Sequence, residues 1–484
     1  MDHPSLYRGR RVAVLGLAKS GVSVAKVFHQ LGADVVVNDK KDREQSPEAA
    51  ELEALGIPVI CGYHPDDFVT ADTALLIKNP GIPYSASPVQ QAEAHGVEIV
   101  TEVEVAYFLS PAPMIGITGS NGKTTTTTWI GELLKGAGMA PIVAGNIGTP
   151  LCEAAQQAKE SDIIVAELSS FQLKGTTAFR PRVALLLNVV ETHLDYHGGM
   201  DDYVTSKAKL FANQSADDTA VLNWDDKTCR AIAERINARL LPFSLIETLP
   251  HGLYIDPPFP AESDEPQDGQ GEVEAEETLR SIIYASGDGE KSVILPVTEL
   301  GIPGRHNAAN AMAAIAAAIA AGAPLETLAG PLRSFRGVEH RLEFVCERNG
   351  VSFYNNSKAT NPVATITGLK SFPLERVVLI AGGLDRGSDY MELLPWFSGL
   401  KALVALGETR NKLAHVAGLA GLTAVETVEP EEDAEATLQE AVRRAAALAG
   451  SGDVVLLSPA CASWDMFKSY EQRGRIFKQS AHTL

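Results

Sequence analysis

Three long stretches of the chain repeat one pattern, in which a short apolar run rich in β-branched residues precedes a segment with helical spacing. The first stretch opens with RVAVLG at 11–16, continues with VSVAKVFHQLG at 22–32, and returns to an apolar run, DVVVND, at 34–39. This alternation predicts parallel strands joined by helices. It continues to about residue 110, where Pro111 and Pro113 mark a linker.

The second stretch begins with MIGITG at 114–119, an apolar run that enters a glycine-rich loop. Three further runs, DIIVAELSS, VALLLNVV and TAVLNW, are almost continuously apolar. Such runs favour parallel strands that are covered on both faces. An alanine-rich segment from about Asn307 to Ala321 predicts a helix, with Asn307 as its N-cap.

The third stretch contains the apolar runs VSFYN, RVVLIAGG, ALVALGE and DVVLLSPA, with helical segments between them. We therefore predict an α/β protein with three domains in series. A Rossmann-like N-terminal domain is expected at 1–110, and a P-loop domain with a mostly parallel sheet at 111–337. A Rossmann-like C-terminal domain is expected at 338–484.

The charge of the chain argues against a nucleic-acid partner. Lys plus Arg number 41 and Asp plus Glu number 61, so the net charge is −20. A duplex-binding protein needs a basic surface. Eight of the acids lie between Ala261 and Glu277 with no base among them. We read residues 257–277, rich in Pro, Glu, Asp and Gly, as an exposed, mobile loop.

The cysteines and the apolar runs bear on location. Five cysteines occur, an odd number, and none form a C-x-x-C motif, which favours a reducing compartment. No apolar run reaches the roughly 18 residues that suggest a transmembrane helix. We expect a cytoplasmic protein without a membrane span, and a monomer.

The segment GITGSNGKT at 116–124 carries the clearest chemistry. Phosphate chains need backbone N–H donors at close range, a lysine for the β- and γ-phosphate charge, and a hydroxyl for the Mg²⁺ shell. All three are present, although five residues rather than four separate Gly116 from Gly122. The segment predicts a nucleotide site at Lys123 and Thr124.

The loop GLAKSG at 16–21 is a broken dinucleotide fingerprint, because it lacks the G-x-G pair. Asp39 follows at the end of the second apolar run, where a Rossmann domain places an acid for the ribose. From these residues alone an NAD site, a site for another nucleotide and a purely structural turn all stay open.

Several polar residues follow apolar runs, and the carboxyl ends of parallel strands are where ligands bind. Glu167 and His193 are placed in this way, and both types can ligate metals. Asn310 lies one turn beyond Asn307, so amides there could contact a purine. The polar loops 355–362 and 458–463 suggest a ligand site in the third domain, with ordinary turns as the alternative.

The motifs GITGSNGKTT, AELSSFQL, ETHLD, GRHNAANAMAA, EHRLE, NNSKATNP and LLSPACASWDMFKSYEQRG occur in this order and resemble those of the Mur ligases. The likeness runs from about residue 10 to 478 and leaves out the acidic segment near 257–277. Within the family, the motifs look most like those of the member that joins D-glutamate to UDP-N-acetylmuramoyl-L-alanine. The resemblance implies an ATP-dependent amide ligase of cytoplasmic peptidoglycan precursor synthesis.

The resemblance also assigns residues to each ligand. Those expected at ATP are Gly119, Ser120, Asn121, Gly122, Lys123, Thr124, Thr125, Asn307, Asn310, Arg341 and Asn356. Those expected at the UDP substrate are Lys19, Ser20, Asp39, Lys40, Lys41, Gly81 and Asn146. Those expected at D-glutamate are Lys358, Thr360, Arg386, Ser463 and Tyr470.

The catalytic residues that the resemblance implies are Lys123, His193 and Lys207, with Lys207 carbamylated. Thr124, Glu167, His193 and Lys207 are implied as ligands or organisers of two Mg²⁺ ions.

Two positions depart from the family pattern. Asn356 stands where the family usually has Asp, which keeps hydrogen bonding but loses charge. Lys40 and Lys41 stand where an Arg is usual, which keeps an anion site but loses bidentate geometry.

Other functions fit the sequence less well. A sibling Mur ligase or a folylpolyglutamate synthase would use the same chemistry, but the latter lacks a UDP-binding first domain. A catalytically silent nucleotide-binding protein is disfavoured by Lys123, Glu167, His193 and Lys207. An NAD-dependent oxidoreductase is disfavoured by the missing G-x-G.

Overall fold

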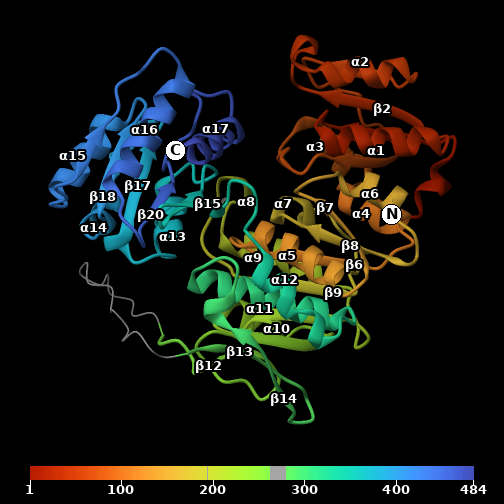
Figure 1. The fold of residues 1–484 in the computed structure, drawn as a ribbon. Helices are drawn as coiled ribbons and strands as arrows, with labels where there is room; N and C mark the ends of the chain where they lie inside the picture. The colour runs from red at the N-terminus through yellow and green to blue at the C-terminus, as the bar shows by residue number, and fades with distance from the viewer. Residues whose placement is uncertain (193, 262–278) are drawn as a thin grey trace. The chain divides into compact units, whose positions relative to one another are not determined.

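The computed structural model describes residues 1–192, 194–261 and 279–484, and its strands form three sheets in series along the chain (Figure 1). The predicted α/β class is confirmed. By the packing of the backbone the chain divides into two compact units. One comprises Met1–Pro258, Ile282–Ile294 and Ala309–Pro331, and the other comprises Leu295–Ala308, Leu332–Leu484 and the described part of Phe259–Ser281. The domain boundaries after residues 110 and 337 stay predictions.

The N-terminal sheet is parallel throughout and has the strand order β3-β2-β1-β4-β5. Alternate residues of β1 face opposite sides: Val12 and Val14 pack in one apolar cluster, whereas Ala13 and Leu15 pack in another. The strands are β1 (Arg11–Leu15), β2 (Asp34–Asp39), β3 (Val59–Cys61), β4 (Thr73–Lys78) and β5 (Ile99–Val100). The helices are α1 (Lys19–Gln30), α2 (Pro47–Ala54), α3 (Ser87–His95) and α4 (Glu102–Leu109).

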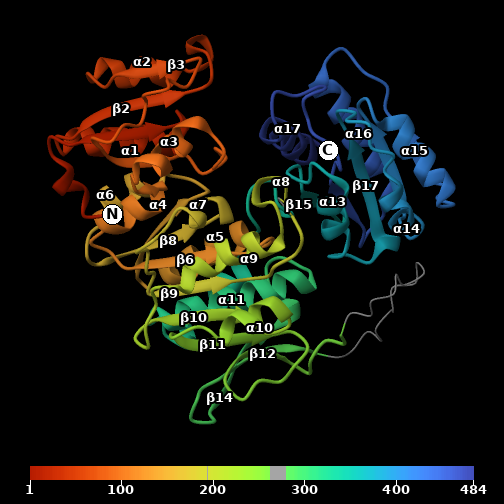
Figure 2. The same cartoon turned by 180° about the vertical axis from the view of Figure 1, so that it is seen from behind.

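The central sheet has nine strands in the described residues, in the order β14-β13-β12-β11-β10-β9-β6-β8-β7. Neighbours from β12 through β7 pair in parallel, as predicted, and those from β12 to β8 follow one another across the sheet in Figure 2. The strands are β6 (Met114–Thr118), β7 (Ala140–Gly145), β8 (Asp162–Glu167), β9 (Val183–Leu186), β10 (Thr219–Asn223), β11 (Arg239–Ser244), β12 (Gly252–Asp256), β13 (Ser281–Ala285) and β14 (Lys291–Pro296).

The helices that follow these central strands are mostly short. They are α5 (Lys123–Gly136), α6 (Leu151–Gln157), α7 (Ser170–Lys174), α8 (Leu194–His197), α9 (Met200–Ala208), α10 (Lys227–Ala233), α11 (Arg305–Ala320) and α12 (Ala329–Ser334). The acidic segment that we predicted to be a mobile loop lies almost wholly outside the described residues.

The C-terminal sheet has the order β15-β16-β20-β17-β18-β19 and is parallel except for β15, which pairs antiparallel with β16. Helices cover both faces, with α16 and α17 on one and α13 to α15 on the other (Figure 1). The strands are β15 (Glu343–Arg348), β16 (Val351–Asn355), β17 (Val377–Gly382), β18 (Ala402–Leu406), β19 (Val425–Thr427) and β20 (Val454–Leu457). The helices are α13 (Pro362–Leu369), α14 (Leu394–Phe397), α15 (Arg410–Leu419), α16 (Ala434–Leu448) and α17 (Tyr470–Thr483).

Two features concern membrane-spanning helices and disulfide bonds. Across the described ranges, every helix is too short or too polar to cross a lipid bilayer. All five cysteines are free thiols.

Candidate active site

The phosphate-binding motif has the predicted strand–loop–helix context. Strand β6 ends at Thr118 and α5 begins at Lys123, with Gly122 as its N-cap at φ 82°. A side chain at Gly122 would be strained by this φ, and its Cβ would lie 2.3 Å from Oδ1 of Asn310. The loop therefore needs glycine here, and Asn310 packs directly against it.

Two lysines meet at the first carbonyl of this loop. Nζ of Lys123 donates to the carbonyl oxygens of Gly119 at 2.8 Å and Ser120 at 2.9 Å. Nζ of Lys207, on α9, donates to the same Gly119 oxygen at 2.9 Å. Lys207 is 1% exposed. Burial, with the nearby Lys123 ammonium as a second cause, lowers the pKa of Lys207 to about 6.

Glu167 lies beside the loop because β8 pairs in parallel with β6, with Glu167 opposite Ile117. Oε1 of Glu167 accepts a hydrogen bond from Nδ2 of Asn146 at 2.8 Å. Oε2 is buried and has no hydrogen-bond partner. A buried carboxylate oxygen without a donor is costly unless a cation completes it, so this carboxylate fits a Mg²⁺ site.

Beyond Glu167, the predicted metal ligands are Thr124, His193 and Lys207. Thr124 is buried in the first turn of α5. His193, the second predicted metal ligand, lies outside the described residues. Within the described ranges no three His, Cys, Asp or Glu side chains cluster as a metal site. A full ligand set would therefore need Thr124, His193 or a modified Lys207.

Tyr203 belongs to this site and was not predicted. Its hydroxyl lies 2.9 Å from Oγ of Ser120, and Nζ of Lys207 lies 4.6 Å from the centroid of its ring. Tyr203 precedes Lys207 by four residues on α9, a spacing that puts both on one helix face. That spacing was the signal in the sequence.

Asn307 was predicted to cap the alanine-rich helix, and this was wrong. Helix α11 begins at Arg305, so Asn307 lies within its first turn. Its side-chain amide donates to the carbonyl oxygen of Pro303 at 2.6 Å. The glycine at 304, with φ 108°, lets the helix start earlier than the polar pattern indicated.

In the N-terminal sheet, Asp39 organises the loop that we predicted for the UDP substrate. Its Oδ2 accepts from the backbone N–H of Leu17 at 2.7 Å, and its Oδ1 accepts from that of Lys41 at 2.9 Å. Asp39 thereby joins the GLAKSG loop to the segment of Lys40 and Lys41, both exposed. Both carboxylate oxygens of Asp39 thus accept hydrogen bonds from the backbone of its own domain.

The remaining N-terminal candidates surround this loop. Lys19 and Ser20 form the first turn of α1, whose N-cap, Ala18, offers no side-chain cap. A side chain at Gly16 would put Cβ 2.7 Å from Cβ of Asn79, so the GLAKSG loop lies against the segment that leads to Gly81. Asn146, predicted for the same substrate, donates a hydrogen bond to Glu167, and its role at the substrate stays a prediction.

The candidates in the C-terminal domain lie on loops that follow β16, β17 and β20, three neighbouring parallel strands. The backbone N–H of Leu384 donates to the carbonyl oxygen of Ala462 at 2.9 Å, which joins the loop carrying Arg386 to the loop carrying Ser463. Oγ of Ser357 donates to the carbonyl oxygen of Tyr470 at 2.8 Å. The loops are thus held together at one edge of the sheet.

Arg473, which the sequence did not single out, connects two of these loops. It is 1% exposed. Its Nη2 donates to the carbonyl oxygens of Ser357 at 2.9 Å and Cys461 at 3.2 Å. Burial lowers its pKa to about 10. Arg473 therefore holds the loops of Lys358 and Ser463 side by side.

The polar candidates on these loops make distinct contacts. Nζ of Lys358 lies 5.2 Å from the ring centroid of Tyr470, and the guanidinium of Arg386 lies 5.0 Å from that of the exposed Trp464. Thr360 is part of the same turn as Lys358, since its N–H donates to the carbonyl of Lys358.

Asn356 is satisfied as an amide. Its Oδ1 accepts from the N–H of Leu342 at 3.2 Å and its Nδ2 donates to Oγ of Ser458 at 3.0 Å. A carboxylate could not donate to Ser458, and it could accept from the Ser458 hydroxyl only if that hydroxyl gave up its hydrogen bond to Thr365, which explains locally why Asn fits. Arg341 lies in the Val338–Arg341 bridge that precedes this contact.

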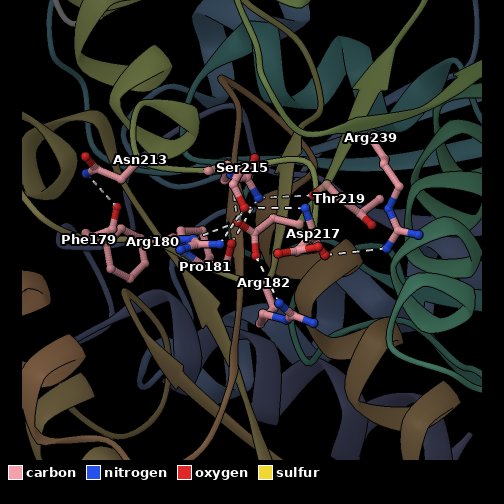
Figure 3. A network of polar contacts seen from close by, with 11 residues as sticks. Phe179, Arg180, Pro181, Arg182, Asn213, Ser215, Asp217, Thr219 and Arg239 are labelled. Carbon is pink, nitrogen blue, oxygen red and sulfur yellow. Dashed lines mark hydrogen bonds and ion pairs between the residues drawn. The ribbon is translucent and has the colours of Figure 1, made fainter.

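A hollow of about 180 Å³ lies at the opposite, amino-terminal edge of the central sheet. Arg182, Arg239, Asp217 and Thr219 line its polar side (Figure 3). Arg182 lies 3.5 Å from the buried Asp218, which also accepts from Nε of Arg180 at 2.7 Å, so acidic groups face these arginines. This network joins the starts of β9 and β10 and is remote in the sheet from the phosphate-binding loop.

Comparisons with known proteins cover nearly the whole chain. Residues 10–101 match the N-terminal domain of MurD-like Mur ligases, residues 117–318 the Mur ligase middle domain, and residues 340–461 the glutamate ligase domain of Mur ligases. The solved structure of UDP-N-acetylmuramate-alanine ligase MurC from Thermotoga maritima covers 98% of this chain and 99% of its own, with a TM-score of 0.55 and 19% identity. That likeness supports the fold alone.

Curated relatives are much closer in sequence. The UDP-N-acetylmuramoylalanine–D-glutamate ligase of Geobacillus sp. (strain WCH70) is 45% identical over 484 residues, covering 100% of both chains. The enzyme of the same name from Shouchella clausii (strain KSM-K16) is 47% identical, covering 98% of this chain and 97% of its own. The chain belongs to the Mur ligase family, with an N-terminal domain of the MurD-like type.

Proposed function

We propose that the protein joins D-glutamate to UDP-N-acetylmuramoyl-L-alanine with the hydrolysis of ATP, in the synthesis of the peptidoglycan precursor. The observation that carries this proposal is the 45% identity, over the full length of both chains, to a relative named for that reaction. Membership of the family implies the use of ATP. The free thiols favour a reducing compartment, so we place the reaction in the cytoplasm, with the protein as a monomer.

The chemistry explains why ATP is needed. A carboxylate does not react with an amine at neutral pH because hydroxide is a poor leaving group. The substrate carboxylate attacks the γ-phosphorus of ATP, and ADP leaves, which gives an acyl phosphate. The amine of D-glutamate then attacks the acyl carbon, loses a proton and displaces phosphate. Negative charge gathers at the transferred phosphoryl group, so a fixed cation at that point stabilises the transition state.

Lys123 would supply this cation. It now rests on the carbonyl oxygens of Gly119 and Ser120, within the loop that surrounds a phosphate chain in this motif. The phosphates of ATP offer stronger acceptors than these carbonyls, so Lys123 turns to them when ATP binds. Thr124 and Glu167 would hold one Mg²⁺ and His193 a second, and the ions would neutralise phosphate charge.

Lys207 is suited to become a carbamate. Its pKa of about 6 leaves the amine largely neutral near pH 7, and a neutral amine attacks CO₂. The nitrogen bonds to the carbon of CO₂ and loses a proton, which converts a neutral amine into an anion with two oxygen donors. An anion beside Lys123 would attract its ammonium group and would provide a carboxylate for Mg²⁺.

D-glutamate binds at the carboxyl edge of the C-terminal sheet. The amino acid carries two carboxylates, so its pocket needs cations and hydrogen-bond donors. Lys358 and Arg386 supply the charge, whereas Thr360, Ser463 and the backbone near Tyr470 supply donors. Arg473 supports this pocket through its hydrogen bonds to two of the pocket's loops.

The UDP part of the other substrate binds at the N-terminal sheet. The open first turn of α1, with Lys19 and Ser20, favours the diphosphate. Lys40, Lys41 and Gly81 lie near the uracil, and Asp39 acts chiefly by shaping the backbone between them. Asn146 contacts the substrate next to the phosphate-binding loop.

The proposal is tested by following phosphate release and identifying the product. The purified protein should release phosphate only when ATP, Mg²⁺, UDP-N-acetylmuramoyl-L-alanine and D-glutamate are all present. Mass spectrometry should then show the UDP substrate extended by one glutamate residue. Phosphate release without any extended product would contradict the proposed ligase activity.

A further inference from the structure

Lys78, the last residue of β4, is a fully buried lysine that belongs to none of the ligand sites proposed above. Its Nζ donates to the carbonyl oxygens of Asn79 at 3.2 Å, Pro80 at 3.1 Å and Ile82 at 2.5 Å. The charged group that acts on Lys78 is the ammonium of Lys174, and no carboxylate contributes. A lysine buried in this way costs stability, and that cost favours a role for the segment that it binds.

Tyr196, on α8, completes the same cluster from the central domain. Its hydroxyl lies 3.1 Å from Nζ of Lys78 and donates to the carbonyl oxygen of Pro80 at 2.9 Å. The next residue, His197, fixes α8 through two further hydrogen bonds. The His197 ring lies 2.9 Å from Oγ of Ser170 and 2.8 Å from a carboxylate oxygen of Asp202. These bonds hold the short helix α8 in place, and α8 in turn fixes the position of the Tyr196 hydroxyl.

The consequence for segment 79–82 is a fixed orientation of its carbonyl groups. The carbonyl oxygens of Asn79, Pro80 and Ile82 are bound by Lys78 and Tyr196. At Gly81, by contrast, a Cβ would meet nothing within 4 Å. In the described part of the chain, no hydrogen bond uses the N–H of Gly81. The segment thus keeps a donor available, while its acceptors are occupied.

We propose that Lys78 and Tyr196 are positioning residues for the UDP substrate, which they serve by holding the carbonyl oxygens of segment 79–82 away from the ligand. This inference rests on the proposed function. A diphosphate and the uracil ring present acceptor oxygens, and free carbonyl groups in the loop would repel them.

The test uses the full chain with Tyr196→Phe, which removes one hydroxyl and keeps the ring. Tyr84→Phe is the matched control, because the ring of Tyr84 also lies near Nζ of Lys78, at 4.7 Å, but its hydroxyl binds none of the three carbonyl oxygens. Calorimetry measures the Kd of UDP-N-acetylmuramoyl-L-alanine and, separately, of a non-hydrolysable ATP analogue. Thermal unfolding of each variant is recorded in parallel.

We expect Tyr196→Phe to raise the Kd of the UDP substrate about five- to tenfold, the loss typical of one hydrogen bond. The Kd of the ATP analogue should stay within twofold, and Tyr84→Phe should match the unmodified protein in both. Lys78→Met should weaken UDP-substrate binding at least as much, and the double variant should lose less than the product of the single losses.

Equal weakening of both ligands, or no weakening by Tyr196→Phe, would overturn the positioning role. Tyr196→Phe decides the matter even if Lys78→Met fails to fold. An unmodified protein that does not bind the UDP substrate at all would instead reject the proposed function, so the two failures are distinguishable.

Discussion

The side chains of Lys123 and Lys207 donate to one and the same acceptor, the carbonyl oxygen of Gly119, at 2.8 and 2.9 Å. Two ammonium groups at one neutral oxygen repel each other, which contributes to the lowered pKa of the more deeply buried Lys207. The arrangement is relieved if Lys123 turns to phosphate and Lys207 becomes an anion. The first change accompanies the proposed binding of ATP, and the second is the proposed carbamylation of the resting protein.

Replacing Lys123 by Ala should reduce kcat about 10²- to 10³-fold, because a preorganised charge at the transferred phosphoryl group is lost. Lys135→Ala is the control, since Lys135 lies exposed on the last turn of the same helix, α5. Steady-state phosphate release measures both. Near-normal turnover of Lys123→Ala would remove the phosphate-binding loop from the mechanism.

Lys207 should carry a carbamate in the resting protein at neutral pH. After equilibration with ¹³C-labelled bicarbonate, carbon NMR should show one protein-bound carbamate signal, which Lys207→Ala abolishes. Lys209→Ala is the control, because Lys209 follows on the same segment but donates to the carbonyl oxygens of Lys174 and Thr176 instead. A signal that survives Lys207→Ala would assign the carbamate to another lysine.

The sequence predicts local structure well where a motif and its element are contiguous. The apolar run MIGITG and the following glycines and Lys123 specify β6, the loop and α5 within a single segment. The sequence does not reveal side chains whose partners are remote. Tyr203 meets Ser120 across 83 positions, and Arg473 meets Ser357 across 116. Short strands such as β3 and β19 are also not predicted, because three residues are too few to show the alternation of apolar and polar positions that marks a strand.

The stability of the protein should depend on pH through Lys78. Burial, with Lys174 as a second cause, lowers the pKa of Lys78 from 10.5 to about 7. Between pH 7 and 10.5, Lys78 is protonated in the unfolded chain and neutral in the folded chain. The free energy of unfolding therefore rises with pH from about 7 to 10.5. Below about pH 7 both states are protonated, and no further change arises from Lys78.

Lys78→Met removes this titration, so the stability of the unmodified protein relative to the variant should rise by about 1–3 kcal/mol between pH 7 and 9. Urea unfolding at each pH measures the difference. The comparison Lys135→Met, at an exposed lysine, controls for the loss of a surface charge. A difference independent of pH would show that Lys78 stays protonated in the folded protein.

The polar network at the amino edge of the central sheet should contribute stability and not catalysis. The fully buried Asp218 accepts from Arg180 and from the backbone N–H of Ser215 at 2.9 Å. Asp218→Ala leaves these donors without their acceptor and should destabilise the protein by about 2–3 kcal/mol. Asp217→Ala, at the exposed neighbour, should cost much less. The melting temperature should fall for Asp218→Ala while kcat at permissive temperature stays within twofold; a selective loss of kcat would implicate this edge in the reaction.

The central claim is that the C-terminal loops select D-glutamate for transfer to the UDP substrate. The most direct measurement is the rate of phosphate release with ATP, Mg²⁺ and UDP-N-acetylmuramoyl-L-alanine across a panel of D-glutamate, L-glutamate, L-lysine, meso-diaminopimelate and D-alanyl-D-alanine. The account predicts that kcat/KM for D-glutamate exceeds every other value by at least two orders of magnitude, because only this dianion matches Lys358 and Arg386 in charge and handedness. Equal or greater activity with L-lysine or meso-diaminopimelate would contradict it.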